Sequence, residues 1–210
     1  MVHYHFSSLG ENVQCKTMTK WDKFFDEKIK LIAKGKVILD AGGGKPFQKH
    51  MAPYKELFSN SRYISLDKNG SPDDGIVVGD IHQLPFADEF FDAVICKSAL
   101  EHVENPQMAV NEIRRVLKKG GQALFYVPFI FPYHAEKGFY KDYWRFTEDG
   151  LRYLLKDFSK IEIQQVRGFF ETLAVFIPYF RKILIPIGRV MDKFFPSKNQ
   201  TAGFNAFAVK

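Results

Sequence analysis

The sequence predicts an α/β protein built on a doubly wound, mostly parallel sheet with helices on both faces. Three observations carry this prediction. Short apolar segments of strand type alternate with segments of helical periodicity. A run of three glycines, 42–44, directly follows the first strand candidate. Acidic residues recur after successive strand candidates, at Asp40, Asp67 and Asp80. Strands that alternate with helices form parallel sheets, because each helix returns the chain to the edge where the next strand starts.

The first two thirds of the chain supply most of the expected elements. Apolar spacing over residues 21–33 predicts a helix that leads into the first strand. Strands are predicted at residues 36–40, 62–67, 76–78, 92–96 and 122–127. Helical segments are predicted between them at residues 47–57, 99–103 and 106–118. We expect Gly120 and Gly121 to end the last of these as a C-cap.

The last third departs from this alternation. Thr147 is suited to cap a helix that runs to Leu155, because acidic residues at 148 and 149 favour the first helical turn. Two more strands are predicted at residues 161–166 and 203–209. Residues 171–195 between them are apolar, but charged residues and prolines interrupt them before they reach the roughly 20 residues of a membrane span. We expect this segment to be a lid, a protein contact or an interfacial membrane element, and we favour the first two.

Length and composition favour one soluble domain. The 210 residues are 46% hydrophobic and 26% charged, which excludes a disordered chain. We expect a single domain over residues 1–210, with a helical lead-in (1–35), a cofactor-binding core (36–129), an acceptor-side loop and helix (130–158) and a helical insertion (171–195). Cys15 and Cys96 lack metal-ligand spacing, so we expect no metal, and a reducing compartment fits them. The first fifteen residues show no signal-peptide core, so we expect a cytoplasmic location.

The net charge of +6 is concentrated near the end of the chain. Residues 151–210 hold ten basic and four acidic side chains, whereas residues 1–150 are balanced. Such asymmetry marks either an anionic partner or a solvated face. Basic and aromatic residues do not interleave as they do in nucleic-acid-binding segments, so we expect no nucleic-acid partner and at most a weak contact with a membrane surface.

The stretch KVILDAGGGKPF, residues 36–47, points to a ligand. A glycine loop after a buried strand holds the pyrophosphate of a dinucleotide or the amino-acid end of S-adenosylmethionine, or it is an empty turn. A dinucleotide site requires G-x-G-x-x-G/A, and here Phe47 takes the place of the third small residue. The departure disfavours a nicotinamide or flavin cofactor.

Four motifs together resemble one family. VILDAGGGKPF, YISLDKN, GDIHQLPFADEFFDAVICKSALEHVENP and EIRRVLKKGGQALFYVPF are similar to successive motifs of class I S-adenosylmethionine-dependent methyltransferases, in particular the small-molecule (type 11-like) group. The resemblance covers residues 36–129. It implies a Rossmann-like, seven-stranded sheet with an antiparallel last strand, in which residues 161–166 and 203–209 are the sixth and seventh strands.

The resemblance also implies a set of cofactor contacts for S-adenosylmethionine. The loop after the first strand would surround the methionine part, the acid after the second strand and its neighbour would bind the ribose, the turn after the third strand would bind the adenine, and the fourth strand would end along the cofactor. These positions are Asp40, Ala41, Gly42, Gly43 and Gly44, then Asp67 and Lys68, then Asp80 and Ile81, then Lys97.

Candidates for acceptor chemistry follow the fourth and fifth strands. Transfer to oxygen or nitrogen removes a proton, which a side chain within hydrogen-bond reach assists. The candidates are Glu101, His102, His134 and Asp142, and for His102 we favour a structural role over catalysis. The aromatic and polar loop after the fifth strand offers acceptor-binding residues at Tyr133, Tyr143 and Arg145, although core packing and pairing with an acid explain the last two equally well.

Three functions remain open on the sequence. The first is a methyltransferase acting on a small molecule or a sugar; KDYWRFT, residues 141–147, resembles a segment of bacterial methyltransferases from glycan or cell-surface polysaccharide pathways. The second is a nicotinamide-dependent oxidoreductase. The third is a catalytically silent methyltransferase-like subunit that stabilises a partner. The acceptor atom and the oligomeric state are not determined by the sequence.

Overall fold

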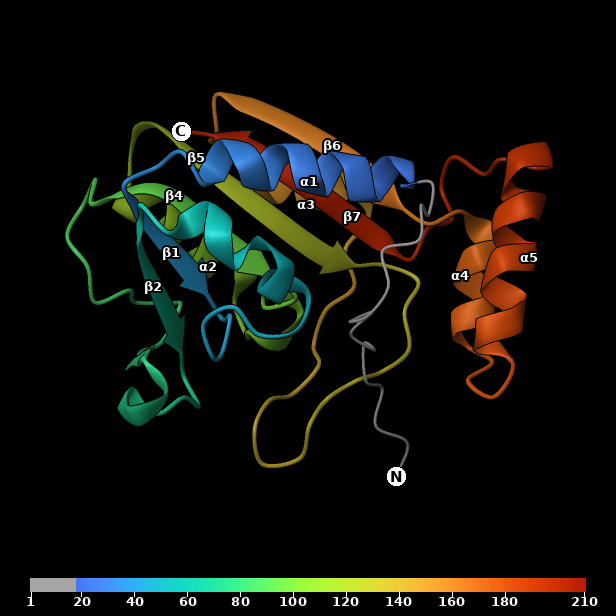
Figure 1. Ribbon diagram of the computed structural model, residues 1–210, viewed down its shortest axis with the longest axis horizontal. Helices are drawn as coiled ribbons and strands as arrows, with labels where there is room; N and C mark the ends of the chain where they lie inside the picture. The colour runs from blue at the N-terminus through green and yellow to red at the C-terminus, as the bar shows by residue number, and fades with distance from the viewer. Residues whose placement is uncertain (1–17) are drawn as a thin grey trace.

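The computed structural model describes residues 18–210. Their strands form one seven-stranded sheet in the order β3-β2-β1-β4-β5-β7-β6 (Figure 1). Only β7 runs antiparallel to both of its neighbours, β5 and β6. The predicted fold class is thereby confirmed. The strands are β1 (Val37–Ala41), β2 (Arg62–Asp67), β3 (Ile76–Val78), β4 (Phe91–Lys97), β5 (Leu117–Pro128), β6 (Lys160–Val166) and β7 (Gly203–Val209). Cys15, one of the two cysteines considered in the sequence analysis, lies outside the described residues.

The start of β5 corrects one prediction. Helix α2 (Pro106–Val116) ends before Leu117, which already pairs with Phe91 of β4. The next paired residue of β5 is Gln122, opposite Ala93, so the glycine pair lies in a bulge of the strand and does not cap the helix. Gly120 has a φ of 73°, a conformation that glycine adopts without steric cost. The two glycines therefore form the bulge near the start of β5.

Two predicted helices take a tighter form. Residues 47–57 were expected as a helix, and η1 (Lys49–Phe58) is a 3₁₀ helix that begins two residues later. Phe47 has a φ of 55°, which excludes it from a right-handed helix, and Pro53 removes one backbone donor from the middle of the segment. The predicted helix at 99–103 is reduced to η3 (Leu100–His102), and η2 (Pro72–Asp74) is an additional short turn.

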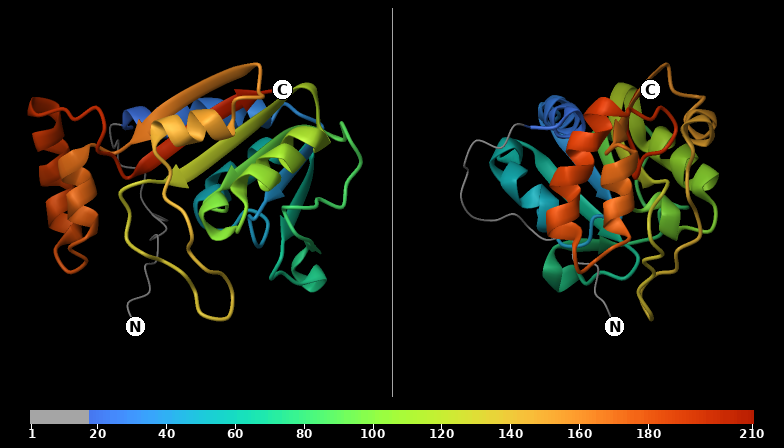
Figure 2. Two further views of the ribbon diagram at one scale, coloured as in Figure 1. Left: turned by 180° about the vertical axis from the view of Figure 1, so that it is seen from behind. Right: turned by 90° about the vertical axis from the view of Figure 1, so that its right-hand side faces the viewer.

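Helices cover both faces of the sheet (Figure 2). On one face, α1 (Lys20–Ile32) and η1 pack on alternate residues of the central strands, among them Ile38 and Ile95. On the other face, α2 and α3 (Glu148–Leu154) pack on the residues between these, among them Leu39 and Val94. Strands of a doubly wound sheet are apolar on both faces for this reason.

The last third contains the predicted capped helix and a helical hairpin. Thr147 accepts a hydrogen bond from the Gly150 backbone at 3.0 Å, which confirms it as the N-cap of α3. Helices α4 (Phe169–Val175) and α5 (Arg181–Phe194) pack against each other beyond the ends of β6 and β7 (Figure 1). Arg189 joins them by an ion pair with the buried Glu171 at 2.8 Å. Across residues 18–210, every helix is too short or too polar to cross a bilayer.

Asp92 ties β1 to β5 and carries a stability prediction. Its carboxylate accepts hydrogen bonds from the backbone of Lys36 (2.9 Å) and Val37 (2.8 Å) and from Lys118 Nζ (2.6 Å). Burial alone would raise the pKa of Asp92, but the bonds from Lys118 and the backbone outweigh it and lower the pKa. We expect Asp92→Asn to lower the free energy of unfolding by about 1–3 kcal/mol at pH 7.

This stability difference depends on pH in a defined direction. Because the folded pKa of Asp92 lies below the ordinary value of 3.8, its stabilisation is complete above that value and is lost as the pH falls towards the folded pKa. Urea unfolding between pH 7 and pH 3 measures the difference. Asp88→Asn is the matched control, since Asp88 pairs with Arg115 but is 74% exposed. Equal effects of the two substitutions would contradict the assignment.

Candidate active site

A cleft of about 1240 Å³ lies at the carboxyl ends of β1, β2, β4 and β5, between the two halves of the sheet. The chain turns from β1 towards β2 on one side and crosses to β4 on the other, and ligands of doubly wound sheets bind at such a switch point. Most of the predicted site residues line this cleft: Asp40, Gly42, Gly43, Gly44, Asp67, Lys68, Asp80, Ile81, Lys97, Glu101, His102, Tyr133, His134 and Tyr143. Ala41, Asp142 and Arg145 do not, and Ala41 is a fully buried core residue.

The glycine loop is held in shape by the protein around it. Gly42 has a φ of 77° and donates its N–H to the Leu66 carbonyl at 2.7 Å. Gln48 Nε2 donates to the Gly43 carbonyl at 2.8 Å, and the Ser65 hydroxyl donates to the Gly44 carbonyl at 2.6 Å. The loop therefore approaches the cleft in a fixed conformation before any ligand binds.

Phe47 explains the departure from the dinucleotide motif. Its ring lies 4.2 Å from the ring of Tyr63 and 5.6 Å from that of Phe58, centroid to centroid. The residue at the third motif position is thus part of the apolar packing beneath η1. In the dinucleotide motif this position carries a small residue so that a helix can pack closely on the strand, and here η1 begins only at Lys49.

Substitution of Gly42 is expected to destabilise this loop. A Cβ at position 42 would lie 2.6 Å from Ala99 Cβ, and the φ is unfavourable for any other residue. Gly138 has a similar φ of 86°, but a Cβ there would meet nothing within 4 Å. We expect Gly138→Ala to cost about 1 kcal/mol of unfolding free energy and Gly42→Ala to cost more. Thermal unfolding measures both, and equal costs would contradict the close contact.

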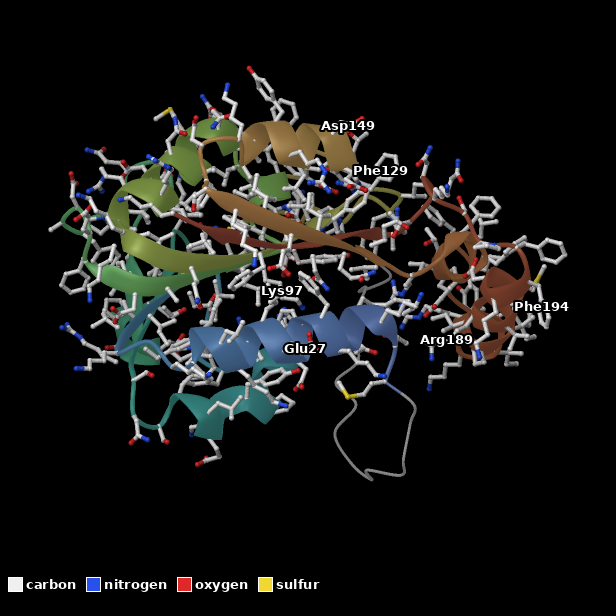
Figure 3. All side chains as sticks on the ribbon, turned by 90° about the horizontal axis from the view of Figure 1, so that it is seen from above. Glu27, Lys97, Phe129, Asp149, Arg189 and Phe194 are labelled. Atoms are coloured by element: carbon white, nitrogen blue, oxygen red, sulfur yellow. The ribbon has the colours of Figure 1, made fainter. Side chains whose placement is uncertain are left out.

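Asp40, which is buried, and Lys97, which is partly buried, place opposite charges on the inner wall of the cleft. The Asp40 carboxylate accepts a hydrogen bond from the Tyr63 hydroxyl at 2.6 Å. Burial raises the pKa of Asp40 to about 6, against the lowering effects of Tyr63 and Lys97. Burial likewise lowers the pKa of Lys97 to about 7. Lys97 lies between α1 and the sheet (Figure 3). Such a pair can bind the ammonium and the carboxylate of an amino-acid group.

The two other predicted acids differ in how they are engaged. The Asp67 carboxylate accepts a hydrogen bond from the Asn69 backbone at 2.9 Å and makes no other hydrogen bond within residues 18–210. Asp80 accepts from the His82 backbone (2.9 Å) and from Lys68 Nζ (3.0 Å), and lies 2.6 Å from His82 Nδ1. Burial would raise the pKa of Asp80, but these bonds lower it to about 2. Asp67 is thus the freer acceptor, and Lys68 is bound to Asp80.

Glu101, His102 and His134 come together at the opposite end of the cleft. Glu101 is 1% exposed, and its Oε1 lies 3.6 Å from His134 Nε2 and 3.8 Å from His102 Nε2. The two imidazole rings are T-shaped, with centroids 4.8 Å apart. Burial lowers the pKa of His102. For His134, burial acts in the same direction, but Glu101, the Pro132 carbonyl and Asp142 outweigh it and raise the pKa.

The loop after β5 places His134 through a second pair of residues. Asp142 accepts a hydrogen bond from the His134 backbone at 2.8 Å and bonds both terminal nitrogens of Arg145 at 2.6 and 2.7 Å. Both residues therefore lie behind the cleft and shape the loop. Tyr143 donates its hydroxyl to Glu104 at 3.0 Å, and Tyr133 is 71% exposed at the mouth.

Several residues of the site were missed on the sequence. Tyr63 and Ser65 lie two positions apart on β2, so the period of two of a strand places both side chains on one face of the sheet. There they contact Asp40 and Gly44. Gln48 and His82 lie in irregular segments, where no periodicity indicates which way a side chain points. Tyr126 lines the cleft from the end of β5, and the sequence only placed it in the strand predicted at residues 122–127.

Comparison with known proteins identifies the central segment. Residues 50–125 match the family model described as "Methyltransferase domain". The chain is 34% identical over 110 residues to demethylmenaquinone methyltransferase of Thermotoga maritima, covering 50% of this chain and 48% of that protein. It is 28% identical over 144 residues to tRNA (carboxymethyluridine(34)-5-O)-methyltransferase of Schizosaccharomyces pombe, covering 67% and 63%. The chain spans about half the length, or less, of the first curated relatives that it matches.

A solved structure shares the fold over nearly the whole chain. A SAM-dependent methyltransferase from Archaeoglobus fulgidus superposes with a TM-score of 0.60, covering 90% of this chain and 92% of that one, at 14% sequence identity. At this identity the similarity establishes the fold alone. Together with the matched segment, it confirms the resemblance read from the four sequence motifs.

Proposed function

We propose that this chain, whose fold and central segment are those of the class I methyltransferases, transfers the methyl group of S-adenosylmethionine to a small molecule or a sugar-type acceptor. One observation carries the proposal. Nearly all of the residues expected to contact the cofactor line one cleft with Glu101, His102 and His134 at the switch point of the sheet. The cofactor residues lie at the ends of β1 to β4, and the other three follow β4 and β5.

The cofactor assignment follows the chemistry of each wall. Asp40 and Lys97 suit the zwitterionic methionine part, and the loop at Gly42–Gly44 lies next to them. Asp67 has a carboxylate oxygen available for the ribose hydroxyls, and Asp80 and Ile81 lie beside it for the adenine ring. Methyl transfer from a sulfonium is an in-line displacement, so most of the acceleration comes from fixing the donor and the acceptor in line. A loop that is rigid before binding supports this role.

The acceptor class is proposed from the loop at residues 129–146. Tyr133, Tyr140 and Tyr143 give this side of the cleft both aromatic surface and hydroxyl groups, a combination suited to sugars and other small polar molecules. The resemblance of KDYWRFT to glycan-pathway methyltransferases supports the same class. The relatives are named for different acceptors, a demethylmenaquinone and a tRNA uridine, and so do not choose among acceptors.

Calorimetric titration separates this function from the two alternatives. We expect S-adenosylhomocysteine to bind with one site per chain and NAD not to bind. Binding of NAD without S-adenosylhomocysteine would overturn the proposal in favour of an oxidoreductase. Binding of S-adenosylhomocysteine without transfer of a labelled methyl group to any acceptor, while a partner protein co-purifies, would favour the silent subunit.

The hairpin of α4 and α5 is proposed as a contact surface. Tyr179, Phe180 and Phe194 are 90%, 61% and 74% exposed, and Phe194 lies on the outer side of α5 (Figure 3). None of the residues that line the cleft comes from 171–195, so in this conformation the segment does not cover the site. We favour a protein contact over a membrane surface. Sedimentation velocity with and without anionic vesicles distinguishes the two.

A cytoplasmic location is proposed as well. The buried free thiol of Cys96 fits a reducing compartment.

A further inference from the structure

The end of the cleft opposite the cofactor residues holds a buried carboxylate whose oxygens make no hydrogen bond within the described residues. Glu101 is 1% exposed, and neither of its carboxylate oxygens makes a hydrogen bond within residues 18–210. Buried polar groups in folded proteins are nearly always hydrogen-bonded, and an exception points to a missing water or ion. Arg145 does not neutralise the Glu101 carboxylate by a direct ion pair, because its guanidinium donates hydrogen bonds to Asp142.

The two neighbouring histidines present lone pairs to this carboxylate. His102 Nδ1 lies 2.6 Å from the Lys141 carbonyl, and His134 Nδ1 lies 3.1 Å from the Pro132 carbonyl. A carbonyl oxygen only accepts, so both Nδ1 atoms carry the hydrogen and each neutral ring has its lone pair on Nε2. These Nε2 atoms are the ones that face Glu101 Oε1, at 3.8 and 3.6 Å. When both rings are neutral, three electron-rich atoms converge on one point, and either a proton on His134, which Glu101 favours, or a metal cation between the three relieves their repulsion.

The arrangement has the dimensions and the outer partners of a metal site. One ligand atom from each of Glu101, His102 and His134 lies within 4.8 Å of the other two. Zn²⁺ binds nitrogen and oxygen at about 2.0–2.2 Å, which separates two ligands by roughly 3–4 Å, so a small inward movement completes the set. Metal-bound histidines almost always donate their other N–H to a carbonyl or carboxylate, as both do here.

The protein holds this cluster together from outside. The Glu101 carbonyl accepts hydrogen bonds from the backbone of Tyr143 (2.8 Å) and Trp144 (3.2 Å), which fixes the loop after β5 against η3. Asp142 accepts from the His134 backbone at 2.8 Å. The donor atoms are therefore positioned by backbone contacts that do not use them, which leaves them available to a ligand.

We propose that Glu101, His102 and His134 bind one divalent transition-metal cation, and that this cation binds the oxygen of the methyl acceptor. Two histidines and one carboxylate leave coordination positions open, and all three residues line the cleft on its acceptor side. The metal-binding part stands independently of the proposed function, whereas the acceptor part rests on it. The proposal replaces our expectation from the cysteine spacing that the protein contains no metal.

The open positions define the class of acceptor. A divalent cation lowers the pKa of a bound hydroxyl as it does that of bound water. The hydroxyl proton passes to water at the mouth of the cleft, the oxygen forms the new bond to the methyl carbon, and the pair of the broken carbon–sulfur bond returns to sulfur, giving the thioether. The acceptor is thus an alcohol or a phenol, and the product is a methyl ether.

Titration of chelator-treated protein with Zn²⁺ alone and with Mn²⁺ alone tests the metal site. We expect one ion per chain, and we expect His134→Ala and Glu101→Gln each to weaken binding by more than about 100-fold, beyond the cost of losing an outer partner. His50→Ala is the control, an exposed histidine that lines the same cleft outside the cluster, and it is expected to leave the affinity unchanged. His102→Ala provides a third ligand variant if Glu101→Gln does not fold, as judged by circular dichroism.

Three outcomes are distinguished in the same preparations. Stoichiometric binding that the ligand variants abolish, with two imidazoles in the X-ray absorption spectrum, supports the site. Absence of binding, or equal binding by wild type and all variants, overturns it. Binding of S-adenosylhomocysteine is measured separately, so that failure of the proposed function, which is loss of cofactor binding, is not confused with failure of the metal site.

Discussion

Asp67→Ala is expected to weaken the binding of S-adenosylhomocysteine by about tenfold to hundredfold while leaving the fold intact. A hydrogen bond to a charged group contributes about 1.5–3 kcal/mol, and a ribose offers two hydroxyls to one carboxylate. The Asp67 carboxylate accepts a single hydrogen bond within the described residues, from the backbone of Asn69 just after β2. Its loss therefore removes little from the folded protein. Isothermal titration with S-adenosylhomocysteine measures the change.

Two further substitutions separate the ligand contact from the local turn. Asp67→Asn retains an oxygen that can accept from the Asn69 backbone but loses the charge, so we expect most of the affinity loss to persist. Asp73→Ala removes a carboxylate from the exposed η2 turn outside the cleft, and we expect no change in affinity. Wild-type affinity in a folded Asp67→Ala variant would refute the role of Asp67.

His134→Ala is expected to lower turnover by about 100-fold to 10,000-fold, with cofactor affinity changed by less than about twofold. His134 lies at the acceptor end of the cleft, 3.6 Å from the buried Glu101, and none of its contacts involves the residues assigned to the cofactor. Its loss removes either the group that takes the acceptor proton or a ligand of the ion that activates the acceptor. Both act on the transition state, so turnover falls and cofactor binding does not.

The measurement is a transfer assay with labelled S-adenosylmethionine on sugar and phenol acceptors, combined with titration of S-adenosylhomocysteine. Asp67→Ala and His134→Ala are expected to show opposite patterns, the first chiefly in cofactor affinity and the second chiefly in turnover. Full turnover by a folded His134→Ala variant would mean that the acceptor is activated elsewhere or needs no activation. Loss of both properties together would place His134 in the folding of the loop.

The agreement between sequence and structure is closest where local pattern decides the outcome. All seven predicted strands form, because a strand buried on both faces is a short apolar run bounded by turn residues. The capped start of α3 at Thr147 was predictable because the cap and the amides it binds are neighbours in the chain. The acid after each of the first strands was likewise placed by the topology alone, since parallel strands end at one edge of the sheet.

Local pattern failed where long-range contacts choose between alternatives. The glycine pair at 120–121 is as good a helix cap as a strand bulge, and the pairing of Leu117 with Phe91 across the sheet selected the bulge. The segment at 49–58 was tightened to a 3₁₀ helix by Pro53 and by Phe47, whose backbone follows from its packing on Tyr63. Asp80 was expected to bind the adenine, and its bonds with Lys68 and His82 were not predicted from the sequence.

The sequence by itself determined the sheet, the glycine loop and the row of acids, because each depends on residues close together along the chain or on the direction of parallel strands. Only the tertiary structure decided which side chains meet at the acceptor end of the cleft. Helix α2 and strand β5 separate Glu101 from His134 along the chain, and the two meet because the loop after β5 folds back and its Tyr143 backbone donates a hydrogen bond to the Glu101 carbonyl. The orientation of both imidazoles depends on carbonyls of that same loop, and no periodicity in the sequence encodes it.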